Sequence, residues 1–320
     1  MARADLLVSL IRSGNRGDKV AFRKVAESLI AEEQIKGHRI LADRLRDSLV
    51  VNGHQNGTVS PILNKKNLFY ELTPSRKLSS LFLPKTVVEQ VGNIIEEQHR
   101  SELLHSYNLS ARNRILLTGS PGNGKTSLAE AIATELLVPL IVVRYEGLIG
   151  SYLGETASRL QQIIDYAKTQ RCVLFLDEFE TIGKERGDTH ETGEIKRVVS
   201  SLLLQIDDLP DYVVVIAASN HPELLDKAVW RRFQVRVELP KPTVSQISKY
   251  VDSLSKRTNV NFGLAASTIS KKLVSANFAE IEEVCLTIAR RAVLEKKVEN
   301  AKSISSKIIE QWKKRFKPSK

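Results

Sequence analysis

The sequence of 320 residues contains no long hydrophobic run. Its longest apolar stretches, such as residues 212–218, are far shorter than the roughly 20 residues that a membrane-spanning helix needs. The first residues, MARAD, do not have the layout of a secretory signal peptide. These absences predict a protein without a membrane segment, and we expect it to be cytoplasmic.

Cysteine is equally scarce, with only two residues in the chain. Cys172 and Cys285 lie far apart in apolar surroundings, without the CxxC spacing of a zinc or redox site. We expect both side chains to be buried and reduced. The sequence also has no fixed-period repeat and no low-complexity tract, which argues against a repeat protein and against bulk disorder.

The remaining composition is that of a folded protein, with 42% hydrophobic and 27% charged residues. A length of 320 residues predicts more than one domain. Most of the net charge of +11 belongs to the end of the chain, because residues 291–320 contain ten Lys and Arg against three Glu. Such a basic end is compatible with binding to nucleic acid, and it is also typical of a solvated helix end.

The first third of the chain divides into a helical segment and a linker. Apolar side chains recur at helical spacing within residues 1–50, at Phe22, Val25, Ala26, Leu29 and Ile30. The next segment, residues 51–67, is rich in Asn, Gly and Lys, a composition typical of linkers. We predict a small helical N-terminal domain that a linker joins to the rest of the chain.

The region from residue 68 to residue 242 alternates short apolar runs with helical patterns. These runs are rich in Val, Ile and Leu, and they lie at residues 114–117, 140–143, 172–176, 213–217 and 235–239. Near-continuous apolar strands separated by helices indicate a parallel sheet with helices on both faces. The remaining residues, 243–320, have a helical pattern throughout. We therefore predict an α/β core followed by a small helical domain.

Residues 119–126, GSPGNGKT, match the pattern G-x-x-x-x-G-K-[ST] of a phosphate-binding loop. The match follows a predicted strand and precedes a predicted helix, as such a loop requires. Its glycines let backbone N–H groups turn toward the phosphates, while Lys125 reaches the β and γ phosphates and the Thr126 hydroxyl binds Mg²⁺. The predicted nucleotide-binding residues of this segment are Gly119, Pro121, Gly122, Asn123, Gly124, Lys125, Thr126 and Ser127.

Polar side chains also follow two later strands of the predicted core. Asp177 and Glu178 come directly after residues 172–176, and Asn220 ends the apolar run that begins at residue 212. Ligands of open α/β sheets bind at the carboxyl ends of the strands. We expect Asp177 to hold Mg²⁺ together with Thr126, and Glu178 to orient and partly deprotonate an attacking water. Asn220 is expected to reach this water and the γ-phosphate.

With these motifs in place, residues 103–239 resemble the AAA+ superfamily of ATPases, and more closely its AAA subgroup. The phosphate loop, the acidic pair and the first sensor of that family match Gly119 to Thr126, Asp177 with Glu178, and Asn220. The resemblance implies a P-loop core with a helical lid, ATP and Mg²⁺ as ligands, and ATP hydrolysis. It also implies that the segment at residues 81–88 helps to cover the adenine.

The resemblance extends to a pair of arginines, Arg231 and Arg232, in the segment that presents arginine fingers to a neighbouring subunit. It therefore implies a ring, most often a hexamer, in which these side chains complete the catalytic site of the next subunit. In the usual pattern two residues separate the arginines, whereas here they are adjacent. Which of them contacts the γ-phosphate is left open, and so is the alternative that both are solvated or in salt bridges.

A polypeptide substrate is implied by residues Tyr152, Leu153 and Gly154, which resemble the aromatic pore loop of AAA translocases. They lie between the strand at residues 140–143 and a helix that we predict from Thr156. An aromatic side chain packs against a passing chain without sequence preference, and Gly154 lets the loop bend. Packing of Tyr152 into the core is the alternative.

The whole chain also resembles stand-alone bacterial AAA ATPases that are encoded beside a subtilisin-like serine protease in two-gene systems of plasmid maintenance and phage defence. A separate protease partner is therefore one hypothesis, since the chain has no G-x-S-x-G motif of its own. The competing hypothesis is a nucleic-acid motor or loader that uses Trp312 and the basic residues after it. A nucleotide switch with little turnover is a third possibility, which both carboxyl groups and both arginines argue against.

Overall fold

A computed structural model describes residues 25, 26, 28, 29, 68–144, 153–180 and 192–315. The chain divides into two compact units, Met1–Ser60 and Pro61–Lys320. In the first unit the four described residues are helical, and Ala26 and Leu29 are buried. The remainder of the predicted N-terminal domain and all of the linker up to residue 67 lie outside the described residues. The predicted domain boundaries stay predictions.

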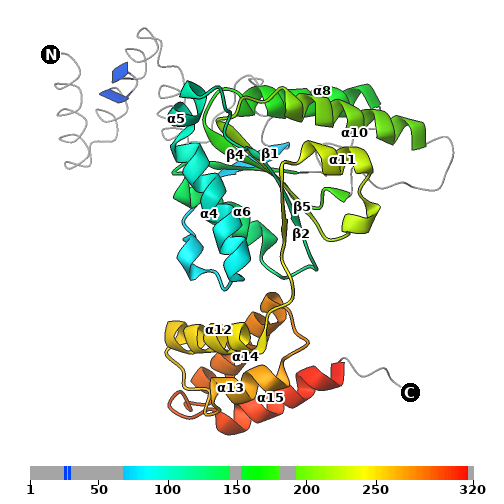
Figure 1. Cartoon of the computed structure of the whole chain (residues 1–320). Helices are drawn as coiled ribbons and strands as arrows, with labels where there is room; N and C mark the ends of the chain where they lie inside the picture. The colour runs from blue at the N-terminus through cyan, green and yellow to red at the C-terminus, as the bar shows by residue number, and fades with distance from the viewer. Residues whose placement is uncertain (1–24, 27, 30–67, 145–152, 181–191, 316–320) are drawn as a thin grey trace. The chain divides into compact units, whose positions relative to one another are not determined.

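The second unit contains a six-stranded sheet in the order β1-β3-β4-β5-β2-β6 (Figure 1). The strands are β1 (Phe69–Leu72), β2 (Arg114–Thr118), β3 (Leu140–Val143), β4 (Cys172–Leu176), β5 (Val213–Ser219) and β6 (Val235–Glu238). Strand β1 pairs antiparallel with β3, and every other pair is parallel. The fold is therefore the predicted α/β class, with a mostly parallel sheet.

Helices cover both faces of this sheet, because successive apolar side chains of each strand point to opposite faces. One face packs on α8 (Leu153–Ala167), α10 (Thr192–Asp207) and α11 (Lys227–Arg232) through strand residues such as Leu116 and Val215. The other face packs on α4 (Lys85–His99) and α6 (Lys125–Glu135) through residues such as Ile115 and Ile216. A short helix, α5 (Ser101–Ser106), follows α4, and single 3₁₀ turns occur at Leu78–Ser80 and Pro222–Leu224.

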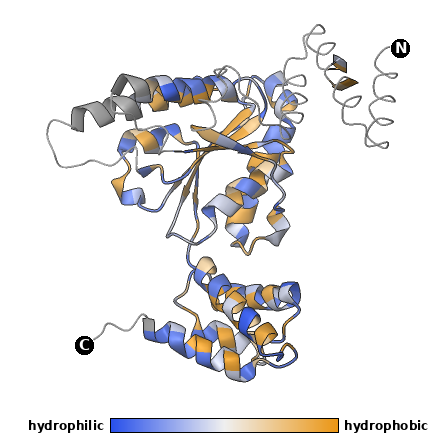
Figure 2. Ribbon diagram, turned by 180° about the vertical axis from the view of Figure 1, so that it is seen from behind, coloured by the Kyte–Doolittle hydropathy of each residue, from blue (hydrophilic) through white to orange (hydrophobic). Residues whose placement is uncertain are grey.

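Four helices form the C-terminal part of the second unit: α12 (Val244–Thr258), α13 (Ala266–Lys272), α14 (Phe278–Leu294) and α15 (Lys302–Arg315). They enclose a hydrophobic core of their own, which includes Ile247, Cys285 and Trp312. Figure 2 shows apolar and polar residues alternating along these helices, as in amphipathic helices with one buried face. We call this four-helix part the lid.

Trp312 is buried in the lid core with 8% of its surface exposed, so it cannot stack on a nucleic-acid base in this conformation. The other interpretation of the basic end, the end of a helix, agrees with α15, which extends to Arg315.

Two predicted boundaries were wrong. Helix α8 begins at Leu153 rather than at Thr156, and the last strand ends at Glu238 rather than at residue 239. Both cysteines are free and buried, as expected. Among the described residues, no helix is long and apolar enough to cross a membrane.

Candidate active site

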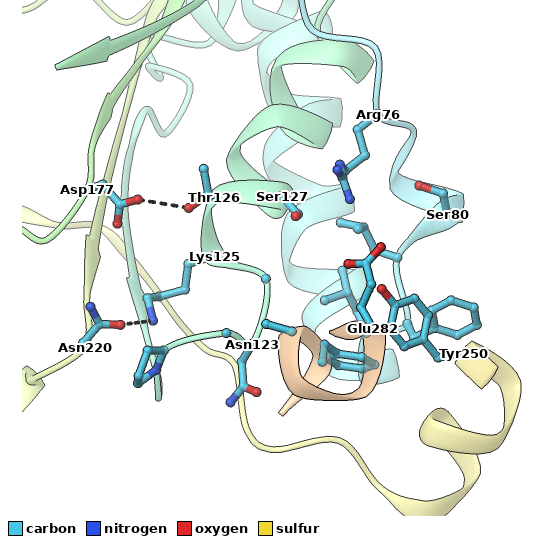
Figure 3. Close-up of a pocket in the computed structure, with 18 of the residues that line it drawn as sticks. Arg76, Ser80, Asn123, Lys125, Thr126, Ser127, Asp177, Asn220, Tyr250 and Glu282 are labelled. Atoms are coloured by element: carbon cyan, nitrogen blue, oxygen red, sulfur yellow. Dashed lines mark hydrogen bonds between the residues drawn. The ribbon is translucent and has the colours of Figure 1, made fainter. Parts of the chain in front are cut away.

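A pocket of about 380 Å³ lies at the carboxyl ends of three neighbouring strands, β4, β5 and β2. Strand β2 leads into the predicted phosphate loop, β4 leads to Asp177 and Glu178, and β5 ends one residue before Asn220. The segment from Pro121 to Ser127 lines the pocket together with these three side chains. The structure thus gathers in one place residues that are far apart in the sequence (Figure 3).

The backbone of the phosphate loop adopts conformations that favour glycine at two pocket positions. Gly122 has a φ angle of +78° and Gly124 one of +90°. Gly124 is also the N-cap of helix α6, which begins at Lys125, so the free N–H groups of the first helical turn lie at the end of the loop. Such a helix start carries positive partial charge and is a natural site for phosphate oxygens.

Lys125 is buried at the bottom of this loop, with 6% of its surface exposed. Its Nζ atom donates hydrogen bonds to the carbonyl oxygens of Gly119 at 2.6 Å and Ser120 at 3.2 Å, and to Oδ1 of Asn220 at 2.7 Å (Figure 3). All three hydrogens of the ammonium group therefore have uncharged acceptors. Burial lowers the pKa of Lys125, and the nearby carboxyl groups of Asp177 and Glu180 oppose this shift.

These contacts of Lys125 show how the site fits a phosphate chain. A buried ammonium group that has only uncharged acceptors gains more from an anion, because a charge-assisted hydrogen bond is stronger than one to a neutral group. Phosphate oxygens entering the pocket would replace one or more of the present acceptors. The side chain of Asn220 is the most easily displaced of them, since the other two are main-chain carbonyls of the loop.

Thr126 and Asp177 place two oxygen atoms beside the phosphate loop. The Thr126 hydroxyl donates a hydrogen bond of 3.0 Å to Oδ2 of Asp177, and Oδ1 of Asp177 accepts the backbone N–H of Glu178 at 3.0 Å. Hydroxyl and carboxyl oxygens are the ligands that Mg²⁺ prefers, and this ion commonly combines one or two carboxylates with phosphate oxygens and water. The residues present therefore fit the predicted magnesium site.

Glu178 has a backbone conformation that sequence reasoning missed. Its φ angle is +48°, in the left-handed region, and its side chain is exposed at the pocket. A non-glycine residue in this region costs about 1–2 kcal/mol, and such strained residues are common at functional sites. The turn at Glu178 directs a second carboxyl group to the pocket directly after Asp177, which an extended strand would not do.

The lid and the segment before α4 close the other side of the pocket. Tyr250 of α12 lies between two aromatic rings, with centroid distances of 5.4 Å to Phe82 and 5.3 Å to Phe278. Burial and the neighbouring carboxyl group of Glu282 raise the pKa of Tyr250 well above its ordinary value, so its hydroxyl stays protonated. Leu81, Phe82 and Leu83 line the pocket, and the expected role of residues 81–88 in covering the adenine stays a prediction. The contribution of the lid residues was not foreseen.

Helix α14 of the lid begins directly on the phosphate loop. The backbone N–H of Ala279 donates a hydrogen bond of 3.1 Å to the carbonyl oxygen of Gly122. Asn277 caps the same helix by accepting the N–H of Glu280 at 2.8 Å, and Glu280 in turn accepts the N–H of Asn277 at 2.8 Å. A Cβ atom on Gly122 would come within 2.7 Å of the Asn277 side chain.

The two adjacent arginines of α11 have different surroundings. Arg232 forms an ion pair with Asp207, the last residue of α10, and Asp207 also pairs with Arg114 of β2. Burial, and to a lesser degree the charge of Arg232, lower the pKa of Arg114. Arg231 is exposed, and neither Arg231 nor Arg232 lines the pocket of its own chain.

The predicted pore loop falls largely outside the part of the chain that the structure describes. Tyr152 is not among the described residues. The backbone of Leu153 and Gly154 forms the start of α8, so these two residues belong to a helix and not to the loop that was predicted.

The sheet, the phosphate loop and the polar strand ends together define a P-loop nucleotide-binding protein. Residues 115–241 match the model of the family described as "ATPase family associated with various cellular activities (AAA)". An uncharacterised AAA family ATPase of Sinorhizobium fredii is 34% identical over 305 residues, which cover 93% of this chain and 91% of that protein. The chain belongs to the AAA family, and it is an ATPase.

Two other relatives match a smaller share of the chain. A putative 26S proteasome regulatory subunit homologue of Methanothermobacter thermautotrophicus is 37% identical over 151 residues, which cover 45% of this chain and 41% of that protein. A peroxisomal ATPase of Schizosaccharomyces pombe is 32% identical over 204 residues, which cover 58% of this chain and 21% of that protein. The chain thus matches less than half of the length of these two relatives.

Proposed function

We propose that this ATPase assembles into a ring, most simply a hexamer, and couples hydrolysis of Mg-ATP to the remodelling, unfolding or translocation of polypeptide substrates. The observation that carries this proposal is that the pocket lacks the two arginines of α11 that the family is expected to use in catalysis. Lys125, Glu178 and Asn220 line it, but the arginines of α11 do not, and Arg231 is exposed at the surface. A neighbouring subunit is the natural place for an exposed arginine of this family to act.

Within the pocket the residues have separate tasks. Lys125 and the N–H groups at the start of α6 bind the phosphate chain, and Thr126 and Asp177 hold the magnesium ion. When bound, this ion neutralises charge on the β and γ phosphate oxygens. Glu178 orients the attacking water and accepts its proton, while Asn220, released from Lys125 by the phosphates, reaches the γ-phosphate side.

The polypeptide substrate is proposed from two supports. One is the similarity of part of the chain to proteins named as a putative 26S proteasome regulatory subunit homologue and a peroxisomal ATPase. The other is the sequence of Tyr152 to Gly154, where an aromatic residue precedes a glycine. The competing role on nucleic acid is less well supported, because Trp312, one of the two aromatic residues at the basic end, is buried in the lid core. The other, Phe316, lies outside the described residues.

A mixing experiment tests the shared active site. Arg231→Ala subunits keep Glu178, and Glu178→Gln subunits keep Arg231, so each variant alone should hydrolyse ATP at a small fraction of the wild-type rate. In an equal mixture, about one quarter of the subunit interfaces combine an intact Glu178 with an intact Arg231, if subunits assemble at random. We expect steady-state hydrolysis to recover toward that fraction. A mixture as inactive as its components would contradict the shared site.

The substrate class requires a second measurement. Specific activity should rise with protein concentration as rings assemble, and an unfolded polypeptide should stimulate wild type but not Tyr152→Ala. Basal hydrolysis without polypeptide serves as the control for both proteins. Stimulation by single-stranded DNA in place of polypeptide would favour the nucleic-acid role and would count against the pore loop.

We also propose that a separate subtilisin-like serine protease works with this ATPase, in a system of plasmid maintenance or phage defence. The support is the whole-chain resemblance and the lack of a G-x-S-x-G motif in this sequence. Co-expression followed by size-exclusion chromatography with ATP and Glu178→Gln tests it, because slow hydrolysis preserves the assembled state. Failure of the two proteins to co-elute, with no effect of either on the other's activity, would refute the partnership.

A further inference from the structure

Glu180 is a buried acidic residue that the catalytic scheme above does not use. It follows shortly after β4, beyond Asp177 and Glu178, and 7% of its surface is exposed. Unlike these two residues, it does not line the pocket. Charged residues are rarely buried to this extent without a specific partner.

One oxygen of Glu180 has such a partner, and the other has none. Oε1 accepts the backbone N–H of Asn220 at 3.1 Å. Oε2 is buried without a hydrogen-bond partner among the described residues. A buried acceptor left without a donor weakens the fold, so stability alone would favour an apolar side chain at this position. The side-chain oxygen that accepts the Asn220 N–H therefore points to a functional requirement.

A second hydrogen bond ties the same two segments together. The backbone N–H of Phe179 donates to the carbonyl oxygen of Ala218 at 2.8 Å. The segment after β4 thus donates one hydrogen bond to the end of β5, from Phe179, and accepts one from it, through Glu180. Because Glu178 and Asn220 are the side chains that these segments carry to the pocket, the two bonds set the distance between them.

We propose that Glu180 is a positioning residue that fixes the backbone at Asn220, so that the Asn220 amide is aimed at Lys125 before nucleotide binds and at the γ-phosphate side afterwards. The amide already makes a 2.7 Å hydrogen bond to Nζ of Lys125 (Figure 3). The inference rests on the proposed role of Asn220 in hydrolysis. It assigns to Glu180 no contact with the nucleotide.

The test compares two substitutions of similar size. Glu180→Gln keeps a side-chain oxygen that can accept the Asn220 N–H, whereas Glu180→Met has no comparable acceptor. We expect kcat to fall roughly 10- to 100-fold in Glu180→Met, because a small displacement of a positioned catalytic group has effects of this size. Glu180→Gln should stay within about threefold of wild type. ADP affinity should be unchanged in both, because ADP has no γ-phosphate for Asn220 to reach.

A double-mutant cycle with Asn220→Ala separates positioning from a general effect on the fold. If Glu180 acts through Asn220, adding Glu180→Met to Asn220→Ala should lower kcat no further, since the side chain being positioned is already gone. If Glu180→Met is insoluble, Glu180→Asp withdraws the carboxyl group by one methylene and should show the same loss and the same lack of additivity.

Several outcomes would overturn the inference. These are a wild-type kcat in Glu180→Met, a loss of ADP affinity in proportion to kcat, or effects that multiply in the double mutant. If Asn220→Ala itself leaves kcat unchanged, the proposed role of Asn220 is wrong and the inference falls with it. If Asn220→Ala is impaired and Glu180→Met is not, only the role of Glu180 is wrong.

Discussion

The contribution of the contact between the lid and the phosphate loop to thermal stability can be measured by comparing two glycine substitutions. Gly122 and Gly124 both have positive φ angles, so alanine at either position strains the backbone. A Cβ atom on Gly122 would lie 2.7 Å from the side chain of Asn277, whereas one on Gly124 would meet nothing within 4 Å. Gly124→Ala is therefore a matched control that carries the strain but not the collision.

The expected difference in stability between the two variants follows from the role of Asn277 as the N-cap of α14. Backbone strain should cost about 1–2 kcal/mol in each variant. In Gly122→Ala, the new methyl group also pushes away the Asn277 side chain that caps α14, and losing such a cap costs about 1 kcal/mol. For a unit of this size, a difference of 1 kcal/mol corresponds to about 2–4 °C in melting temperature.

Thermal unfolding of the nucleotide-free proteins, followed by circular dichroism, tests this reasoning. Gly122→Ala should melt about 2–4 °C below Gly124→Ala. In an Asn277→Ala background the two glycine variants should melt together, because the cap and the collision are both absent. Equal melting temperatures in the first comparison, or a gap that persists in the second, would show that Asn277 does not constrain the loop.

Three further predictions concern other charged and polar groups. Arg231→Ala should lower the ATPase rate of assembled protein by about 10³-fold or more, whereas Arg232→Ala, which breaks the ion pair with Asp207, should lower the melting temperature; equal rate losses with unchanged melting would contradict this. Thr126→Val should raise the Mg²⁺ concentration needed for half-maximal hydrolysis without weakening ADP binding in EDTA, and an unchanged Mg²⁺ requirement would count against Thr126 as a ligand. Hydrogen bonds from Arg112 hold the pKa of Glu97 below its ordinary value of 4.5. This stabilisation is present above pH 4.5 and is lost as the pH falls through the lowered pKa, so Glu97→Gln should melt below wild type at pH 7 and approach it in acid; a constant gap would refute the assignment.

The sequence predicted the sheet well because the central strands are buried on both faces. Such strands are continuous runs of Val, Ile and Leu, and the predicted ranges 140–143 and 172–176 agree with β3 and β4. Strand β1, FYEL, was missed because only its first residue is buried and it lies at the sheet edge. A strand of four residues with three exposed positions has no alternating pattern to recognise.

The residues of the candidate site also fall into two groups, those that the sequence predicts and those that only the structure identifies. Lys125, Thr126 and Asp177 belong to short motifs, so local spacing was sufficient to find them. Tyr250 and Glu180 depend on tertiary contacts, with the lid in one case and with the neighbouring strand end in the other. Spacing along the chain does not reveal such contacts.

The hydrogen bond between Gly122 and Ala279 attaches the N-terminal end of helix α14 to the phosphate loop, so a small rotation there is amplified at the other end of the helix. The helix has 17 residues, which corresponds to a length of about 25 Å. A tilt of about 5° at the loop would therefore move the far end of this helix by roughly 2 Å. A displacement of that size is comparable to the van der Waals radius of a methyl group. In the proposed ring it would change the packing of one subunit against the next whenever nucleotide binds or leaves.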